Sequence, residues 1–303
     1  MTEKVAQREK TNGEMRTELL EAANALINDK GRGSSLSILV QDKNYALIAA
    51  DYPKILELEL PEGEGIVAHA VALHEEAAIK FFNISASKIS QYQYRKLLKQ
   101  HTKLVPSVIS LMTRHASVAS DLLEAAKSDS FSRDLLEHKE GPSHSKVTLL
   151  HVARNAPVKL VSLAEKEDKN EINSDFYERL LKSKVDGHSI AVTVAESSSE
   201  AARKLLLLAK NRIFFSDLLQ DSKDDNGKNM FFAMTKWPNV VVDLLKLSIE
   251  RPRYRKSLFE KNHDGVSALD IVPTVIATNN LMSTDVKALV DKLKIMELER
   301  PFK

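Results

Sequence analysis

The feature that most constrains this chain is a segment that recurs along it. Residues 224–265 read DDNGKNMFFAMTKWPNVVVDLLKLSIERPRYRKSLFEKNHDG, with an Asn-Gly pair near the start and an Asp-Gly pair at the end. An apolar run over 230–234 stops at the turn 236–239, a second run covers 240–249, and a short third piece follows. This order predicts helix, turn, helix and short helix. A unit with so few large apolar side chains cannot offset the entropy lost on ordering its own backbone, so neighbouring copies must complete its core.

Recurring apolar pairs, each preceded by an aromatic residue, mark the ends of five units. They are Leu97-Leu98 with Tyr94, Leu135-Leu136 with Phe131, Leu180-Leu181 with Tyr177, Leu218-Leu219 with Phe215, and Leu258-Phe259 with Tyr254. The first members of the pairs are 38, 45, 38 and 40 residues apart, a period near 39 with one longer unit. Chance in a leucine-rich helical protein is the alternative explanation. Turns argue against chance, because Asp186-Gly187, Asn226-Gly227 and Asp264-Gly265 recur 40 and 38 residues apart, where chain reversal needs the positive φ of glycine.

Composition and periodicity predict an all-α fold. Hydrophobic residues make up 43% of the 303 residues, with only 9 Gly and 9 Pro, which suits a helix-rich chain better than a disordered or many-turned β chain. We predict a mobile lead-in over 1–14 and one continuous array of repeats, with helical caps, over 15–303. The last helix is expected from about Thr284, with one apolar face. That face comprises Val286, Leu289, Val290, Leu293 and Met296.

Four segments carry a resemblance to a known family. VTLLHVAR at 147–154 resembles the signature of the ankyrin repeat, and 63–82, 186–208 and 264–272 repeat its outline. The period near 39 and the added third piece resemble the extended ankyrin repeats of effector proteins that intracellular bacteria inject into host cells. The resemblance covers about 33–273 and implies a solenoid of about six repeats that binds a partner protein, with a host protein as one candidate.

Charge and motifs exclude several other classes. Lys plus Arg at 44 against Asp plus Glu at 42 leaves a net charge of +2, so no global field attracts nucleic acid or an anionic membrane. The chain has no cysteine, its first residues are too charged for a signal peptide, and no run of 18 apolar residues occurs. We therefore expect a protein without membrane insertion, in the cytoplasm or secreted into a host cytosol. No catalytic, metal or cofactor motif is present, so we expect no enzyme, metal or cofactor.

The resemblance also implies where a partner would bind. The turn after each first helix, and the outer residues of that helix, would line a concave surface, and the hairpin tips would flank it. The candidates are His74, Arg114, His115, Glu196, Lys236 and Trp237 on the turns, with His188 and Lys228 on the hairpins. Trp237 has two interpretations: an exposed binding anchor, or a core side chain packed on the next unit's turn.

Two other functions stay open. Three-helix repeats of this length also resemble RNA-reading helical arrays, although the basic and stacking side chains those arrays need at one position of every unit do not recur here. The densest basic cluster, RPRYRK at 251–256, could hold phosphates, but Tyr254 occupies the recurring aromatic position, which predicts a buried ring and a solvated charged edge. An enzyme would require a pocket of ionisable groups assembled across repeats.

Overall fold

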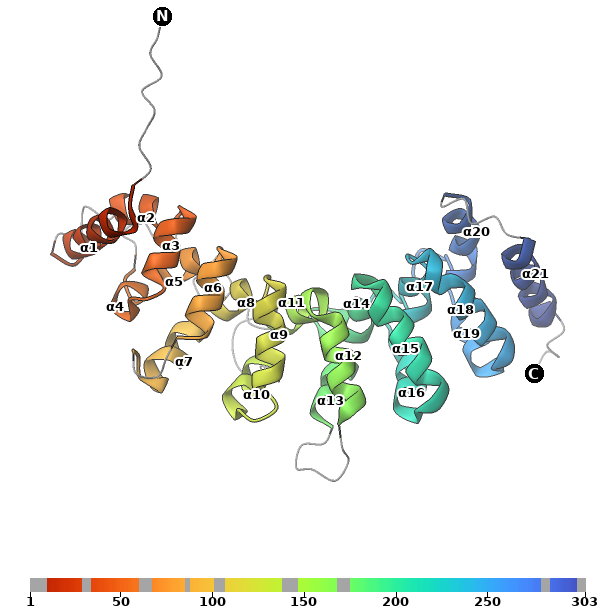
Figure 1. Ribbon diagram of the computed structural model, residues 1–303. Helices are drawn as coiled ribbons and strands as arrows, with labels where there is room; N and C mark the ends of the chain where they lie inside the picture. The colour runs from red at the N-terminus through yellow and green to blue at the C-terminus, as the bar shows by residue number, and fades with distance from the viewer. Residues whose placement is uncertain are drawn as a thin grey trace, which may run out of the picture. The chain divides into compact units, whose positions relative to one another are not determined.

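A computed structural model (Figure 1) describes residues 10–28, 34–59, 67–84, 88–100, 107–137, 147–167, 175–278 and 284–298. The chain divides into two compact units, Met1–Leu122 and Leu123–Lys303, and the boundary falls within helix α9 (Ala116–Ala125). We describe each unit by itself. The expected single array over 15–303 stays a prediction.

The named elements of unit 1 are all helices, within its described residues. Its helices before α9 are α1 (Asn12–Asn28), α2 (Ser34–Leu39), α3 (Lys43–Ala49), α4 (Pro53–Leu56), α5 (Val67–Ala72), α6 (Glu75–Phe82), α7 (Gln91–Lys99) and α8 (Val108–Met112). Helices α3, α5 and α8 pack in sequence order, and α6 covers α3 and α5. The glycine-containing segments 31–33 and 61–65 lie outside the described residues.

The first helix begins earlier than predicted. Helix α1 starts at Asn12, so the lead-in predicted over 1–14 is too long, and its first nine residues lie outside the described part. The cause is a capping box: Thr11 Oγ1 accepts the Glu14 N–H at 3.3 Å, and Glu14 Oε2 accepts the Thr11 N–H at 2.7 Å. These reciprocal bonds satisfy two backbone donors that a helix start otherwise leaves unpaired.

Unit 2 repeats one arrangement of three helices. After the end of α9 it contains α10 (Ser130–Glu137), α11 (Val147–Asn155), α12 (Pro157–Lys166), α13 (Phe176–Lys182), β1 (Lys184–Val185), β2 (His188–Ser189), α14 (Ile190–Ser197), α15 (Ser199–Asn211), α16 (Ile213–Asp221), α17 (Met230–Met234), α18 (Pro238–Glu250), α19 (Pro252–Phe259), α20 (Ala268–Thr278) and α21 (Thr284–Leu298). First helices α11, α14, α17 and α20 pack side by side in that order (Figure 1). Second helices α12, α15, α18 and α21 form a parallel row, and third helices α13, α16 and α19 form another. The all-α prediction is confirmed.

The recurring pairs are the core of the third helices. Both members of the pairs at 97, 135, 180 and 218 are buried. In α19, however, the buried pair is Ser257 and Leu258, whereas Phe259 is partly exposed. The predicted pair Leu258-Phe259 is therefore wrong by one residue. Tyr254 fixes the helix phase, and Ser257 and Leu258 follow it by three and four residues on the same face. On α21, Val286, Val290 and Leu293 are buried as predicted.

Hairpin turns precede the first helices α14, α17 and α20. Strands β1 and β2 pair antiparallel, and single bridges join Lys223 to Asn229 and Lys261 to Ser267. The three turn glycines, Gly187, Gly227 and Gly265, have φ of 79°, 74° and 76°, as the turn motif predicted.

The second and third turns share one internal scaffold. Asp224 Oδ1 accepts the N–H groups of Asn226 and Lys228 at 3.0 and 2.8 Å. Asn262 Oδ1 does the same for Asp264 and Val266, at 3.0 Å each. A short oxygen-bearing side chain at this position thus stands in for a backbone acceptor and fixes the turn.

Successive hairpins are joined through their backbones. The N–H of Asp225 donates to Gly187 O at 2.8 Å, and the N–H of His263 donates to Asn226 O at 3.0 Å. These bonds hold the tips of neighbouring repeats in a row beside the first helices.

This row predicts unequal effects of two glycine substitutions. We expect Gly187→Ala to destabilise unit 2 more than Gly265→Ala. Both impose positive φ on alanine, at about 1–2 kcal/mol, but only at Gly187 would the new Cβ lie 2.7 Å from Asp225 Oδ2, whereas nothing lies within 4 Å at Gly265. Urea unfolding followed by circular dichroism measures both. Equal losses would show that contact between the hairpins adds nothing.

The third helices are tied to the preceding repeat at the carboxyl end of its second helix. Tyr177 Oη donates to Leu123 O at 2.8 Å, and Arg212 Nη1 donates to Glu165 O at 2.5 Å. Arg251 Nη2, 39 positions after Arg212, donates to Lys210 O at 3.0 Å. Positive and hydroxyl donors at this place satisfy carbonyls that a helix end leaves unpaired.

Candidate functional site

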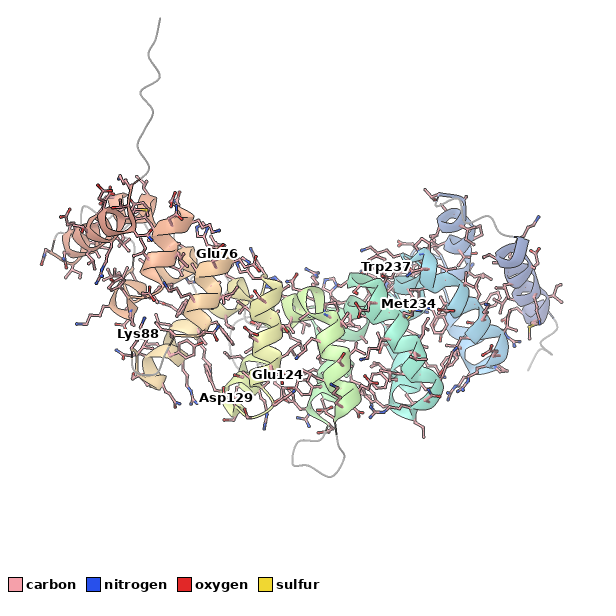
Figure 2. All side chains as sticks on the ribbon, viewed as in Figure 1. Glu76, Lys88, Glu124, Asp129, Met234 and Trp237 are labelled. Atoms are coloured by element: carbon pink, nitrogen blue, oxygen red, sulfur yellow. The ribbon has the colours of Figure 1, made fainter. Side chains whose placement is uncertain are left out.

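Four of the predicted residues lie together in unit 2, where α17 approaches the end of α14. Trp237 Nε1 donates to Ala195 O at 2.8 Å, and Lys236 Nζ donates to Glu196 O at 3.1 Å. The ammonium of Lys236 also lies 5.0 Å from the centre of the Trp237 ring. Figure 2 shows Trp237 at the junction of α17 and α18.

Lys228 joins this group from the hairpin. Its Nζ lies 2.6 Å from Glu196 Oε1 and 5.7 Å from the centre of the Phe232 ring. The side chain of Lys228 is 23% exposed and that of Glu196 is 44% exposed, so the pair sits at the surface with part of its area covered. We call Glu196, Lys228, Lys236 and Trp237 the tryptophan cluster.

Local sequence explains why Trp237 sits in the turn. The Trp237 N–H donates to Met234 O at 3.0 Å, closing α17, and Trp237 itself is the N-cap residue of α18. Pro238 takes the first helical position, where its missing N–H costs nothing and its fixed φ favours the helix start. The indole is therefore held between the two helices and leans on the preceding repeat.

Neither predicted interpretation of Trp237 describes it fully. Its side chain is half-buried, so it is not a free anchor, and it bonds the preceding repeat rather than the turn of the next one. The indole N–H is satisfied by a backbone carbonyl while part of the ring remains accessible. Trp237 thus joins two repeats and still offers apolar area at the surface.

The other predicted residues do not join this cluster. His188 lies exposed on β2, opposite Val185. Arg114 is exposed, and His74 is the N-cap residue of α6; both belong to unit 1, as does His115. His115 Nε2 lies 3.0 Å from Ala72 O, which is the same contact with a preceding first helix that Trp237 makes in unit 2.

One residue of the same kind was missed by the sequence reasoning. Each first helix has a buried residue in its last turn or directly after it, and these residues are Ala72, Thr113, Ala153, Ala195 and Thr235. The residue that follows each is Leu73, Arg114, Arg154, Glu196 or Lys236. Arg154 belongs to this series and is exposed. The signal was present in VTLLHVAR, where Arg154 is the charged residue that follows the buried pair Val152 and Ala153 in the last turn of α11.

The basic cluster at 251–256 is only partly a solvated edge. Tyr254 is fully buried, as predicted, and Arg253 and Lys256 are exposed. Arg255, however, is only 7% exposed, which contradicts the expectation that all its charges face solvent. It lies on the buried side of α19 beside Tyr254. The cluster therefore does not present one continuous basic surface.

The arrangement of the described residues also bears on metal binding and on membrane insertion. Within the described ranges, no three His, Asp or Glu side chains are grouped as metal ligands would be. None of the described helices is long and apolar enough to cross a membrane. No protein-family model, curated protein or solved structure matches this chain.

Proposed function

We propose that this chain is a protein-interaction scaffold, a solenoid of extended ankyrin-like repeats that presents its first-helix turns to a partner protein. The observation that carries the proposal is the tryptophan cluster. It combines a partly exposed indole with an exposed lysine at the junction of two repeats, the mixture of apolar area and charge found in interface hot spots.

Two features of unit 2 support the ankyrin-like part of the proposal. The first helices of the repeats stack in one row, the second helices in another and the third helices in a third row. Each repeat therefore packs mainly on its neighbours. The hairpin tips are joined by backbone bonds from Asp225 to Gly187 and from His263 to Asn226, beside the first helices. A role as an effector that acts on a host protein in the host cytosol is part of the proposal, and it follows from the resemblance in repeat length.

The test uses variants that the structure pairs closely. Trp237→His removes the indole but keeps a ring nitrogen where His115 makes the equivalent contact in unit 1. Lys236→Glu reverses an exposed charge, and Lys246→Glu makes the same change on α18, away from the turns. We expect the first two to lose at least tenfold in partner affinity with unchanged helical circular dichroism, and the third to bind like the wild type.

The partner comes from affinity capture with the purified full chain in eukaryotic cell lysate, with and without nuclease, followed by mass spectrometry. A protein that is retained after nuclease treatment and lost with Lys236→Glu supports the proposal. Capture that disappears with nuclease would instead support the RNA-binding alternative. Equal loss with Lys246→Glu would mean that the turn surface is not the binding site.

A further inference from the structure

Two cations at the turns after the first helices have no ion-pair partner among the residues that the structure describes. The turn positions of unit 2 are Arg154, Glu196 and Lys236, which directly follow the buried residues Ala153, Ala195 and Thr235 at the ends of α11, α14 and α17. These helices are neighbours in one row (Figure 1). We call these three positions the turn row. Their side chains therefore recur on one side of unit 2, one per repeat.

The single acidic member of the turn row is already paired. Lys228 Nζ lies 2.6 Å from Glu196 Oε1, so this position presents a neutral pair. Among the described residues, Arg154 forms no ion pair, and Lys236 donates to the Glu196 carbonyl and lies over the Trp237 ring but forms no ion pair either. Several cations on the second helices, or at the N-cap of a third helix, do form ion pairs. Examples are Lys159 with Glu124, Lys204 with Glu165, and Arg212 with Glu178.

We infer that the turn row binds an acidic, extended peptide segment of the partner. The inference rests on the proposed function and names the chemistry of its partner. Arg154 and Lys236, which form no ion pair within the described residues, flank the neutral pair of Glu196 and Lys228. The exposed part of Trp237 lies directly beside Lys236. Complementary charge would fix the register of such a segment, and the indole would receive one apolar side chain.

The spacing sets the pattern of the segment. Neighbouring packed helices lie about 8–10 Å apart, so Arg154 on α11 and Lys236 on α17 are separated by roughly 20 Å. An extended chain rises about 3.3 Å per residue, so this distance corresponds to about six residues. The segment should carry acidic side chains about six positions apart, with polar or small residues opposite the Glu196–Lys228 pair.

The same surface is less suited to a nucleic acid strand. A strand carries a phosphate about every 3.4 Å of helix axis, so several phosphates would fall between the two cations. The neighbouring hairpin tips also expose Asp186 and Asp264, which repel a polyanion. A peptide can place its carboxylates only where the cations lie.

A selection experiment tests this chemistry even before the partner protein is identified. The full chain is used to select from a phage-displayed library of random 12-residue peptides. We expect the selected peptides to be enriched in Asp and Glu at two places about six residues apart. Recovery of no binders, or of peptides without acidic enrichment, would overturn the inference.

The strongest selected peptide, labelled with fluorescein, then locates the site by fluorescence anisotropy. We expect Arg154→Gln and Lys236→Gln each to weaken binding about tenfold near 0.1 M salt, and Lys246→Gln, an exposed lysine on α18, to leave it unchanged. Equal weakening by Lys246→Gln, or tighter binding of a single-stranded oligonucleotide of the same charge, would contradict the inference. If capture from lysate still yields a protein that depends on Lys236 while acidic peptides fail, the scaffold function stands and only this inference falls.

Discussion

Replacing Tyr254 with alanine is expected to be among the most damaging single changes in unit 2, at about 3–5 kcal/mol. The side chain is fully buried between repeats. Its hydroxyl lies 3.1 Å from Ala209 O and 2.8 Å from Ser216 Oγ. A hydroxyl donates only one bond, so it donates to the carbonyl and accepts from the serine. Alanine removes the ring, leaves a cavity and deprives Ala209 O and Ser216 Oγ of their hydrogen-bond partner.

Tyr254→Phe separates the two contributions. Phenylalanine keeps the ring contact with Phe231, whose centre lies 6.1 Å away, and removes only the hydroxyl. We expect it to cost about 1–3 kcal/mol, because the Ala209 carbonyl and the Ser216 hydroxyl lose a buried partner. Tyr92→Ala is the control: that tyrosine is 78% exposed, so its loss should stay within about 0.5 kcal/mol.

Hydrogen exchange measures which helices lose stability in the Tyr254→Ala variant. In a repeat array, stability is close to a sum of repeat and nearest-neighbour terms. Amides in α18, α19 and α20 should therefore lose protection in Tyr254→Ala before those in α11 and α12. A uniform loss of protection across unit 2 would show that its repeats unfold as one unit and that nearest-neighbour stability does not describe it.

The buried residues of the third helices could be predicted from the sequence because their burial depends on local periodicity. Tyr177, Phe215 and Tyr254 recur three residues before a buried pair, and a helix places residues three and four apart on one face. The same logic misplaced the last pair. Phe259 is the larger apolar residue, but the phase set by Tyr254 puts Ser257 and Leu258 inward instead.

Contacts between repeats were not readable, because they depend on which neighbour covers a side chain. Nothing around Trp237 in the sequence indicates that its N–H reaches back 42 residues to Ala195. The ion pair of Lys228 with Glu196 also joins two repeats, so the sequence did not indicate it either. Arg154 was overlooked because its equivalence with Lys236 emerges only when each first helix is aligned on the buried residue at its end. The candidate site was thus predicted as a list of residues, and its connections came from the structure.

The titration of one carboxyl group, that of Glu167, should make the stability of the protein depend on pH. Burial raises its pKa to about 7, and the nearby charges of Glu178 and Asp175 act in the same direction. The backbone N–H groups of Tyr177 and Glu178 oppose the rise, because they donate to the two carboxylate oxygens at 2.7 and 3.0 Å. Glu167 thereby caps α13 from the end of α12.

Stability should therefore fall as pH rises from about 4.5 to about 7. The folded state keeps the proton on Glu167 across this range while the unfolded chain releases it, so folding binds protons. The contribution is fully present below the unfolded pKa and lost as pH passes the folded pKa. The shift from 4.5 to about 7 corresponds, at about 1.4 kcal/mol per pKa unit, to at most about 3.5 kcal/mol. The contribution is smaller than this limit because the carboxyl is only partly buried.

Chemical unfolding of the wild type and of Glu167→Gln between about pH 2 and pH 8 measures this contribution. We expect the wild type to lose stability relative to the glutamine variant as pH rises, because glutamine does not titrate. Glu124→Gln is a control of opposite sign: hydrogen bonds from Lys127 and Lys159 lower the pKa of Glu124 to about 2, so its stabilisation is lost only as pH falls below about 4.5. A constant difference between wild type and Glu167→Gln would show that the two backbone N–H bonds outweigh burial and keep the carboxylate ionised.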